Sequence, residues 1–282
     1  MDLRIPLYLI LSLLAFAANS VLCRLALGHG YIDPISFTSI RLISGAIALG
    51  AVLWFANRKT NSSGASRGSW LGAICLFVYA IAFSFAYITL ETGTGALILF
   101  GTVQISMLSW AFFKGQKLGT FEVLGVLLAF GGISYLMLPS ISTPSLYGFL
   151  LMMLSGVAWG TYSLLGQGSQ SPLSDTAYNF IRTLPVALIL FVGFYSSSQL
   201  TLNGIVFAVI SGVLASGVGY AIWYKVLPLL ANSVAAVSQL SVPIIAAVGG
   251  LIWVSEPLTL RLMLSSILVL GGIFLVIKMK RS

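Results

Sequence analysis

The sequence predicts an all-α polytopic membrane protein with ten transmembrane helices. Of its 282 residues, 59% are apolar and only 7% are charged, whereas about a quarter of the residues in a soluble domain are charged. Apolar stretches of about 20 residues, each long enough to cross a hydrocarbon core about 30 Å thick, follow one another almost without interruption. The basic residues are scattered among short connecting segments. These observations exclude a single soluble core and argue against a nucleic-acid partner, which needs a clustered basic face.

Ten apolar runs, each bounded by turn or charge signals, define the predicted helices in chain order. The first five cover residues 6–27, 34–56, 70–89, 93–113 and 120–138. The second five cover residues 146–167, 176–195, 202–224, 228–254 and 259–277. The longest connection, 57–69, is a Ser/Gly-rich linker. No connection is long enough for a soluble domain.

The basic residues between these runs predict the orientation of the chain, because Lys and Arg in short loops stay on the cytoplasmic side. With the N-terminus inside, the inside segments hold Arg4, Arg58, Lys59, Arg67, Lys114, Lys117, Lys225, Lys278, Lys280 and Arg281. The short outside segments hold none, and the other four arginines fall within predicted helices or at their outer ends. We therefore expect both termini in the cytoplasm.

The chain also resembles itself at a shift of about 140 residues, the first property to check in so uniform a sequence. Residues 37–41 fall on 178–182, and residues 129–133 fall on 269–273. Five helices is an odd number, so residues 1–140 and 141–282 are predicted to be two five-helix repeats of opposite orientation, a plan common in secondary transporters. Chance similarity among apolar helices is the alternative. The repeat also argues that the N-terminal run is retained, although Ala15-Phe16-Ala17 imitates a signal-peptidase site.

Three short motifs stand out in the second repeat: the turn Ser255-Glu256-Pro257-Leu258-Thr259, Ala158-Trp159-Gly160 in the sixth helix, and Pro243 in the ninth. In its ten helices, two repeats and these motifs, the chain resembles the EamA-type branch of the drug/metabolite transporter superfamily. The three motifs are similar to that family's acidic turn, its Trp-Gly element and its mid-helix proline. The resemblance covers essentially the whole chain, and it implies gradient-linked transport of amino acids or similar metabolites, often export, across a bacterial-style inner membrane.

The first repeat departs from this family pattern. Gln116-Lys117 stands where the acidic turn is expected, Ala18-Asn19 where Trp-Gly is expected, and Gln104 where the proline is expected. These departures leave the implied fold intact, with a central cavity built from helices one to four and six to nine. They make it unsafe to transfer a substrate from any relative.

Two intramembrane arginines are the first candidates for substrate binding, since ionisable residues inside a membrane are costly and usually functional. Arg41 and Arg182 each lie about two turns into a helix, and the two helices enter from opposite sides. A guanidinium suits bidentate binding of a carboxylate. Alternatively, each arginine pairs with a helix end or extends to the lipid headgroups.

Aromatic residues form the second group of candidates. Tyr79 and Phe83 are spaced by four, so they share one stripe of the third helix. Tyr220 lies on the eighth helix, which corresponds to the third, and Trp159 belongs to the Trp-Gly element. Such rings could line a pathway for an apolar or aromatic substrate, or they could serve packing and interfacial anchoring alone.

Uncharged polar residues deep in predicted helices form the third group: Asn19, Gln104, Tyr162, Asn179 and Gln239. Their hydrogen bonds would go unmade in lipid, so they should face the bundle interior and bond either a substrate or another helix. Gln104 and Gln239 are the sharper candidates, because they lie on helices four and nine, which the family uses near its central cavity.

The sequence predicts no enzyme, metal or cofactor site. It has one His and two separated Cys, and it lacks the spacings of known hydrolytic motifs. No carboxylate falls in the middle third of a predicted helix, so protons are one candidate coupling ion among several. The expected partners are a small-molecule substrate and the lipid bilayer. A channel or facilitative pore, or a multidrug or cation exporter, is the alternative function.

Overall fold

The computed structural model describes residues 4–60, 66–115, 119–138, 144–166, 169–226, 229–230 and 238–279. Within these residues the chain is helical, and the only β pairing is an isolated antiparallel bridge between Ile32 and Leu200. Ten helical spans follow one another in the described ranges. The predicted all-α polytopic class is thereby confirmed.

The first seven spans are α1 (Arg4–Gly28), α2 (Pro34–Thr60), α3 (Trp70–Ala86), α4 (Thr92–Phe113), α5 (Thr120–Leu136), α6 (Leu146–Gly166) and α7 (Pro172–Gly193), which a short 3-10 turn, η1 (Tyr195–Ser197), follows. The eighth runs through α8 (Leu202–Ile210), the π-helical η2 (Ser211–Val218) and α9 (Gly219–Val226). The ninth joins α11 (Ser241–Gly249) to the π-helical η4 (Gly250–Val254), and the tenth is α12 (Leu260–Met279). Residues 228 and 231–237 of the predicted ninth helix lie outside the described ranges.

Local chemistry explains several helix starts. The Ser69 hydroxyl accepts the backbone N–H of Gly72 at the start of α3, and Thr201 does the same for Gly204 at the start of α8. Proline at the first position starts α7 at residue 172, four residues before the predicted start at 176. Seven spans are long and apolar enough to cross a membrane; α3, α5 and α11–η4 are shorter apolar helices.

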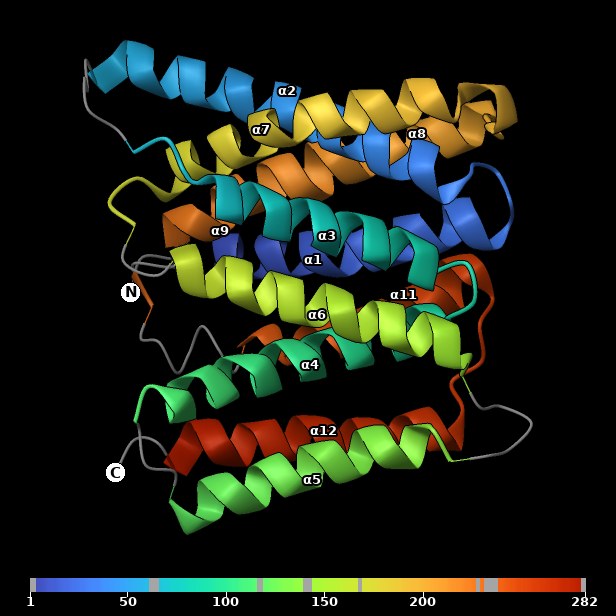
Figure 1. The fold of residues 1–282 in the computed structure, drawn as a ribbon. Helices are drawn as coiled ribbons and strands as arrows, with labels where there is room; N and C mark the ends of the chain where they lie inside the picture. The colour runs from blue at the N-terminus through green and yellow to red at the C-terminus, as the bar shows by residue number, and fades with distance from the viewer. Residues whose placement is uncertain are drawn as a thin grey trace.

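The spans form an antiparallel bundle in which successive helices run in opposite directions (Figure 1). α5 and α12 lie side by side at one edge, and α2 and α7 pack together near the opposite edge. α1, α4, α6 and α11 fill the centre, where α4 contacts both α6 and α11. The first described residues of α1 and the last of α12 lie at one end of the bundle, which we call the basic end.

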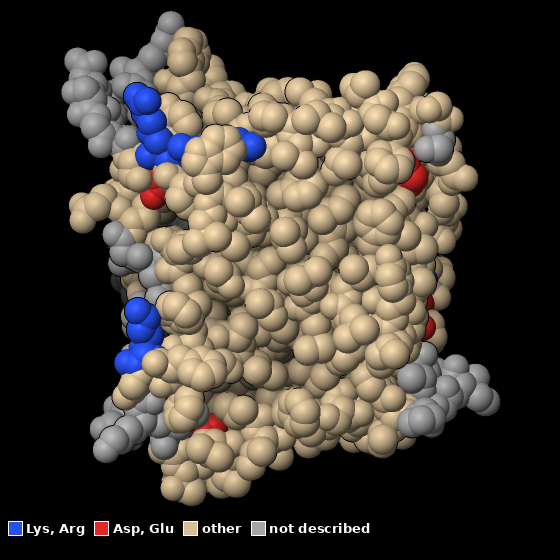
Figure 2. All heavy atoms as spheres, viewed as in Figure 1, with Lys and Arg blue, Asp and Glu red and all other residues tan. Residues whose placement is uncertain are grey.

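The circumference of the bundle is apolar. In Figure 2, lysines and arginines gather in the left part of the view, at the basic end, and uncharged residues form the broad face between the two ends. Large apolar side chains such as Leu127 of α5, Ile189 of α7 and Ile267 of α12 are exposed on the surface. Such a surface is unfavourable in water and is expected where lipid is the solvent.

Small residues allow the close contact between α5 and α12. A Cβ atom on Gly125 would lie 2.5 Å from the carbonyl oxygen of Gly272, whereas a Cβ on Gly131, also in α5, would meet nothing within 4 Å. Glycines of this kind let two helix backbones approach without a side chain between them.

Gly125→Ala is expected to lower stability by about 1–3 kcal/mol, because α5 and α12 must separate to fit the new methyl group. Gly131→Ala should raise it by up to about 1 kcal/mol, because alanine favours a helix more than glycine and has open space at this position. Thermal unfolding of the purified protein in detergent measures both. A stabilising Gly125→Ala would show that the contact tolerates a side chain.

Candidate functional site

A narrow cavity lies in the centre of the bundle, where α1, α3, α4, α6 and α9 meet. Its lining residues are Phe16, Asn19, Ser20, Tyr79, Phe83, Leu99, Phe100, Trp159 and Tyr220. It contains about 330 Å³ of space not filled by atoms, including the part that opens outward. Most of the wall is aromatic, and five of the predicted site residues belong to it: Asn19, Tyr79, Phe83, Trp159 and Tyr220.

The rings of the wall contact one another across four helices. Trp159 of α6 lies between Tyr79 of α3 and Tyr220 of α9, with ring centroids 4.8 Å and 5.2 Å away. Phe16 of α1 meets Tyr220 edge to face at 5.8 Å. Aromatic pairs at these separations attract one another beyond the effect of buried area. The wall is therefore a cohesive apolar surface that suits a flat or apolar group.

Arg41 of α2 lies against this wall. Its Cζ atom is 5.2 Å from the ring centroid of Phe83 and 5.3 Å from that of Tyr79. Its Nη2 donates to the Tyr79 hydroxyl at 3.1 Å, and its Nε donates to Ser216 Oγ at 3.3 Å. The side chain is buried with 2% exposure, and Nη1 has no hydrogen-bond partner in the part of the chain that the structure describes.

No carboxylate neutralises Arg41 in the described part of the chain, where the one ion pair joins Arg24 to Glu256. Burying an unpaired charge is expensive in free energy. Cation–π contact with two rings recovers part of that cost. The positive charge of Arg41 is therefore not neutralised by any described carboxylate and lies beside Tyr79 and Phe83, two residues of the cavity wall, although Arg41 itself is not one of the lining residues.

A polar network connects Arg41 to α1 through the π-helical segment η2. Asn19 Oδ1 accepts hydrogen bonds from Ser211 Oγ at 2.7 Å and from Ser216 Oγ at 3.4 Å. Gly212 lets η2 pack closely on α2, since a Cβ there would collide with the Arg41 carbonyl oxygen. π-Helical turns are often found at functional sites. Here the turn presents two hydroxyls on the side that faces Asn19.

A second, more polar hollow lies at the basic end, between α3, α6 and α7. It contains about 580 Å³ of unfilled space, and its lining includes Ser66, Asp175 and Asn179. Tyr162 also lines it and donates to Thr176 Oγ1 at 3.2 Å. The Tyr162 ring is 5.4 Å from that of Trp159. These two rings stand between the basic-end hollow and the central cavity.

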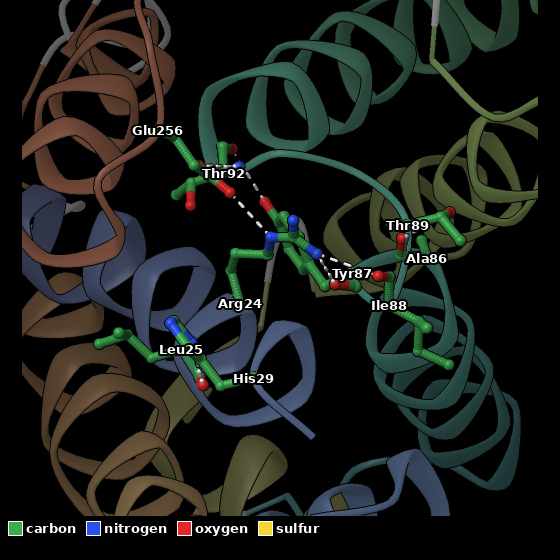
Figure 3. Close-up of polar contacts among 9 residues, drawn as sticks. All are labelled: Arg24, Leu25, His29, Ala86, Tyr87, Ile88, Thr89, Thr92 and Glu256. Carbon is green, nitrogen blue, oxygen red and sulfur yellow. Dashed lines mark hydrogen bonds and ion pairs between the residues drawn. The ribbon is translucent and has the colours of Figure 1, made fainter. Parts of the chain in front are cut away.

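At the opposite end of the bundle, one arginine ties three segments together (Figure 3). Arg24 of α1 pairs with Glu256 at 2.7 Å and donates to the carbonyl oxygens of Tyr87 and Ile88, at 3.0 Å each. Glu256 also accepts the backbone N–H of Thr92 at 2.7 Å. Arg24 lies about one helical turn beyond the cavity residue Ser20. This Arg24–Glu256 cluster therefore lies beyond the cavity, on the side away from the basic end.

Glu91 lies beside this cluster, between α3 and α4. Burial raises the pKa of its carboxyl group above the ordinary value of 4.5, and the negative charge of Glu256 raises it further, against the opposing effect of Arg24. The folded state thus holds this proton more tightly than the unfolded chain. Ionisation of Glu91 consequently lowers stability as the pH rises above the ordinary value.

Glu91→Gln is expected to raise the thermal midpoint at neutral pH and to have little effect below the ordinary glutamate pKa, where the wild-type carboxyl is protonated in both states. Thermal unfolding in detergent at a series of pH values measures the difference. A wild type that is more stable than the variant at neutral pH would contradict this linkage.

The other predicted site residues do not line the central cavity. Arg182 extends toward the basic end, where its Nη1 donates to the Arg67 carbonyl oxygen and its guanidinium lies 5.6 Å from the ring centroid of Trp70. Tyr162 and Asn179 line the basic-end hollow. Gln104 and Gln239 are half-buried. The structure thus brings Arg41 and the five wall residues together and leaves these five apart.

Sequence reasoning missed several residues around the cavity. Ser211 and Ser216 are unremarkable hydroxyls in an apolar run, and Phe16 is one phenylalanine among 17. The pairing of Arg24 with Glu256 could have been predicted, because the sequence places this helix-end arginine and the Glu256 turn, which bear opposite charges, on the same side of the membrane. Cys23 and Cys75 are free, and the described residues contain no cluster of His, Cys, Asp and Glu that could hold a metal ion.

Comparison with known proteins agrees with this architecture. The chain is 48% identical over 276 residues to the uncharacterized protein PA1977 of Pseudomonas aeruginosa, covering 98% of this chain and 95% of that protein. It is 27% identical to an uncharacterized transporter of Archaeoglobus fulgidus, covering 88% of this chain and 90% of that one. A solved crystal structure of a protein with 18% identity aligns with a TM-score of 0.66 over 96% of this chain and 97% of that chain, which shows a shared fold.

The EamA-like transporter family matches the sequence twice in succession, over residues 3–138 and again over residues 146–278. Together these matches cover nearly the entire chain, and the apolar spans of the structure are those of a multi-pass membrane protein. This protein therefore belongs to the EamA-like transporter family of the drug/metabolite transporter type.

Proposed function

We propose that this protein is a secondary transporter that exports a small metabolite carrying a carboxylate, an amino acid or a related compound, across the inner membrane by alternating access. The proposal rests on Arg41, which is buried against the aromatic wall of a central cavity and has no counter-ion among the described residues. A carboxylate bound there would neutralise the guanidinium, while the rest of the substrate contacts the rings.

The packing of the helices supports alternating access between two inverted repeats. In such a repeat, each span corresponds to the span five positions along the chain. The α3–α6 contact then corresponds to the α8–α1 contact, and the α4–α6 contact corresponds to the α11–α1 contact. All four contacts are present. Two carboxylates match in the same way. Asp33 accepts the backbone N–H of Gln199 before α8, and Asp175 accepts that of Gly68 before α3.

The two ends of the pathway differ. The Arg24–Glu256 cluster lies beyond the cavity at one end, while the polar hollow reaches the Trp159–Tyr162 pair from the basic end. The positive-inside rule assigns the basic end to the cytoplasm, so this conformation would admit substrate from inside, which is the first step of export. An impermeant thiol reagent should label Ser145→Cys, but not Lys225→Cys, in intact cells; the reverse pattern would invert the assignment.

Counterflow in proteoliposomes tests the transporter. Vesicles are loaded in turn with amino acids, organic acids, nucleobases, sugars and quaternary cations, and uptake of the labelled compound is followed. Saturable exchange of carboxylates, lost in Arg41→Met and retained in Gln104→Ala, is the expected result. Flux without saturation would favour a pore, and preferential exchange of cations would overturn the assigned role of Arg41.

A further inference from the structure

The positions of the acidic residues distinguish two classes of carboxylate-bearing substrate, those with an ammonium group and those without one. The chain has six acidic residues, and none of the five described ones lines the central cavity. Asp33, Glu122 and Asp175 accept backbone N–H groups near helix starts, Glu256 pairs with Arg24, and Glu91 lies before α4. The sixth, Asp2, lies outside the described residues.

An amino acid needs a partner for its ammonium group as well as its carboxylate. The cavity offers the ammonium no anion, and its hydrogen-bonding groups are few: Asn19, Ser20 and the tyrosine hydroxyls. Asn19 Oδ1 already accepts two hydrogen bonds from serines. Removing an ammonium group from water without a compensating partner is costly in free energy. Binding of a zwitterionic amino acid in this cavity is therefore unfavourable compared with binding of a carboxylate that has no ammonium group.

The aromatic rings do not replace the missing anion. Tyr79 and Phe83 already contact the guanidinium of Arg41. Trp159 and Tyr220 remain, but the Trp159 ring is only 4.8 Å from that of Tyr79. A cation held on these rings would be close to the unneutralised charge of Arg41, and like charges repel strongly in a low-dielectric interior.

Building on the proposed function, we propose that the substrate is a small organic anion with one carboxylate on an aromatic or other apolar body and with no ammonium group. The carboxylate neutralises Arg41, and the apolar body packs on Trp159, Tyr220 and Phe16.

Two series of probes isolate the effect of charge. 3-Phenylpropionate, phenylalanine and phenethylamine share one aromatic body, and hexanoate, norleucine and pentylamine share one aliphatic body. Binding of each labelled probe to the detergent-solubilised full chain is measured by equilibrium dialysis. We expect the anion of each series to bind at least about tenfold more tightly than the amino acid, a difference of about 1.4 kcal/mol, and the amine not to bind saturably.

The variants assign the preference to Arg41. Arg41→Met should remove the advantage of the anion, whereas Arg41→Lys should retain part of it. Arg261→Gln is the matched control, since it removes one positive charge near the start of α12, where the guanidinium lies 5.8 Å from the Tyr135 ring centroid. Loss of the preference in this control would assign it to net charge and overturn the proposal.

The outcomes for wild type distinguish this inference from the proposed function. If phenylalanine or norleucine binds as tightly as its matching anion and is exchanged in vesicles, the transporter stands and the charge preference is wrong. If neither binding nor exchange is found for any compound by folded protein, both proposals fall.

Discussion

Replacing Arg41 with methionine is expected to abolish saturable exchange while leaving the folded protein at least as stable as wild type. The loss follows because a hydrogen-bonded charge contributes about 1.5–3 kcal/mol, which corresponds to a decrease of roughly 10- to 150-fold in substrate affinity. The retained stability follows because methionine fills most of the same volume without the cost of burying a charge. Counterflow and thermal unfolding are measured on the same preparation.

Arg41→Lys is the control for this experiment, since it keeps the charge but loses the two-pronged geometry of guanidinium. We expect it to retain weak exchange. A less stable Arg41→Met protein that still exchanges substrate would reverse the interpretation. Arg41 would then be a structural residue whose contacts with Tyr79 and Ser216 hold α2 against α3 and η2.

Glu256→Gln is expected to lower the thermal midpoint by roughly 6–12 °C. The Arg24 and Glu256 side chains are only 19% and 11% exposed, and removing one partner of a buried ion pair costs about 3–5 kcal/mol, taken here at its lower end because both retain some exposure. The amide can still accept from Thr92, so the loss comes chiefly from the unpaired Arg24 charge.

The double variant Arg24→Gln with Glu256→Gln tests that cause, because it removes both charges. It should recover part of the lost midpoint. If the decrease in thermal midpoint of the double variant equals the sum of the decreases in Arg24→Gln alone and Glu256→Gln alone, the two residues are not coupled. This pair ties α1 to the segment before α12, so Glu256→Gln and the double variant should also open the outer end of the bundle more readily. Labelling of a cysteine introduced as Ser20→Cys by an impermeant thiol reagent would detect that opening.

Hydrophobicity alone determined much of this protein. The ten apolar runs became ten helical spans because each run is long enough to satisfy its own backbone in lipid, and this property is local to the run. The placement of Tyr79 and Phe83 on one stripe of α3 is equally local, since their spacing of four puts them on one helix face. The cost of a charge inside the membrane predicts Arg41 as a site residue.

Only the tertiary structure decided which polar groups meet. Asn19 and Ser211 are 192 residues apart, and Arg24 and Glu256 are 232 apart. Helices that are apolar on every side carry little record of which face turns inward, so packing against neighbours sets their rotation. The same packing separates the two matched arginines. Arg41 is enclosed by α3 and η2, whereas Arg182 reaches the carbonyl of Arg67, because the segments that contact α2 and α7 at these positions differ.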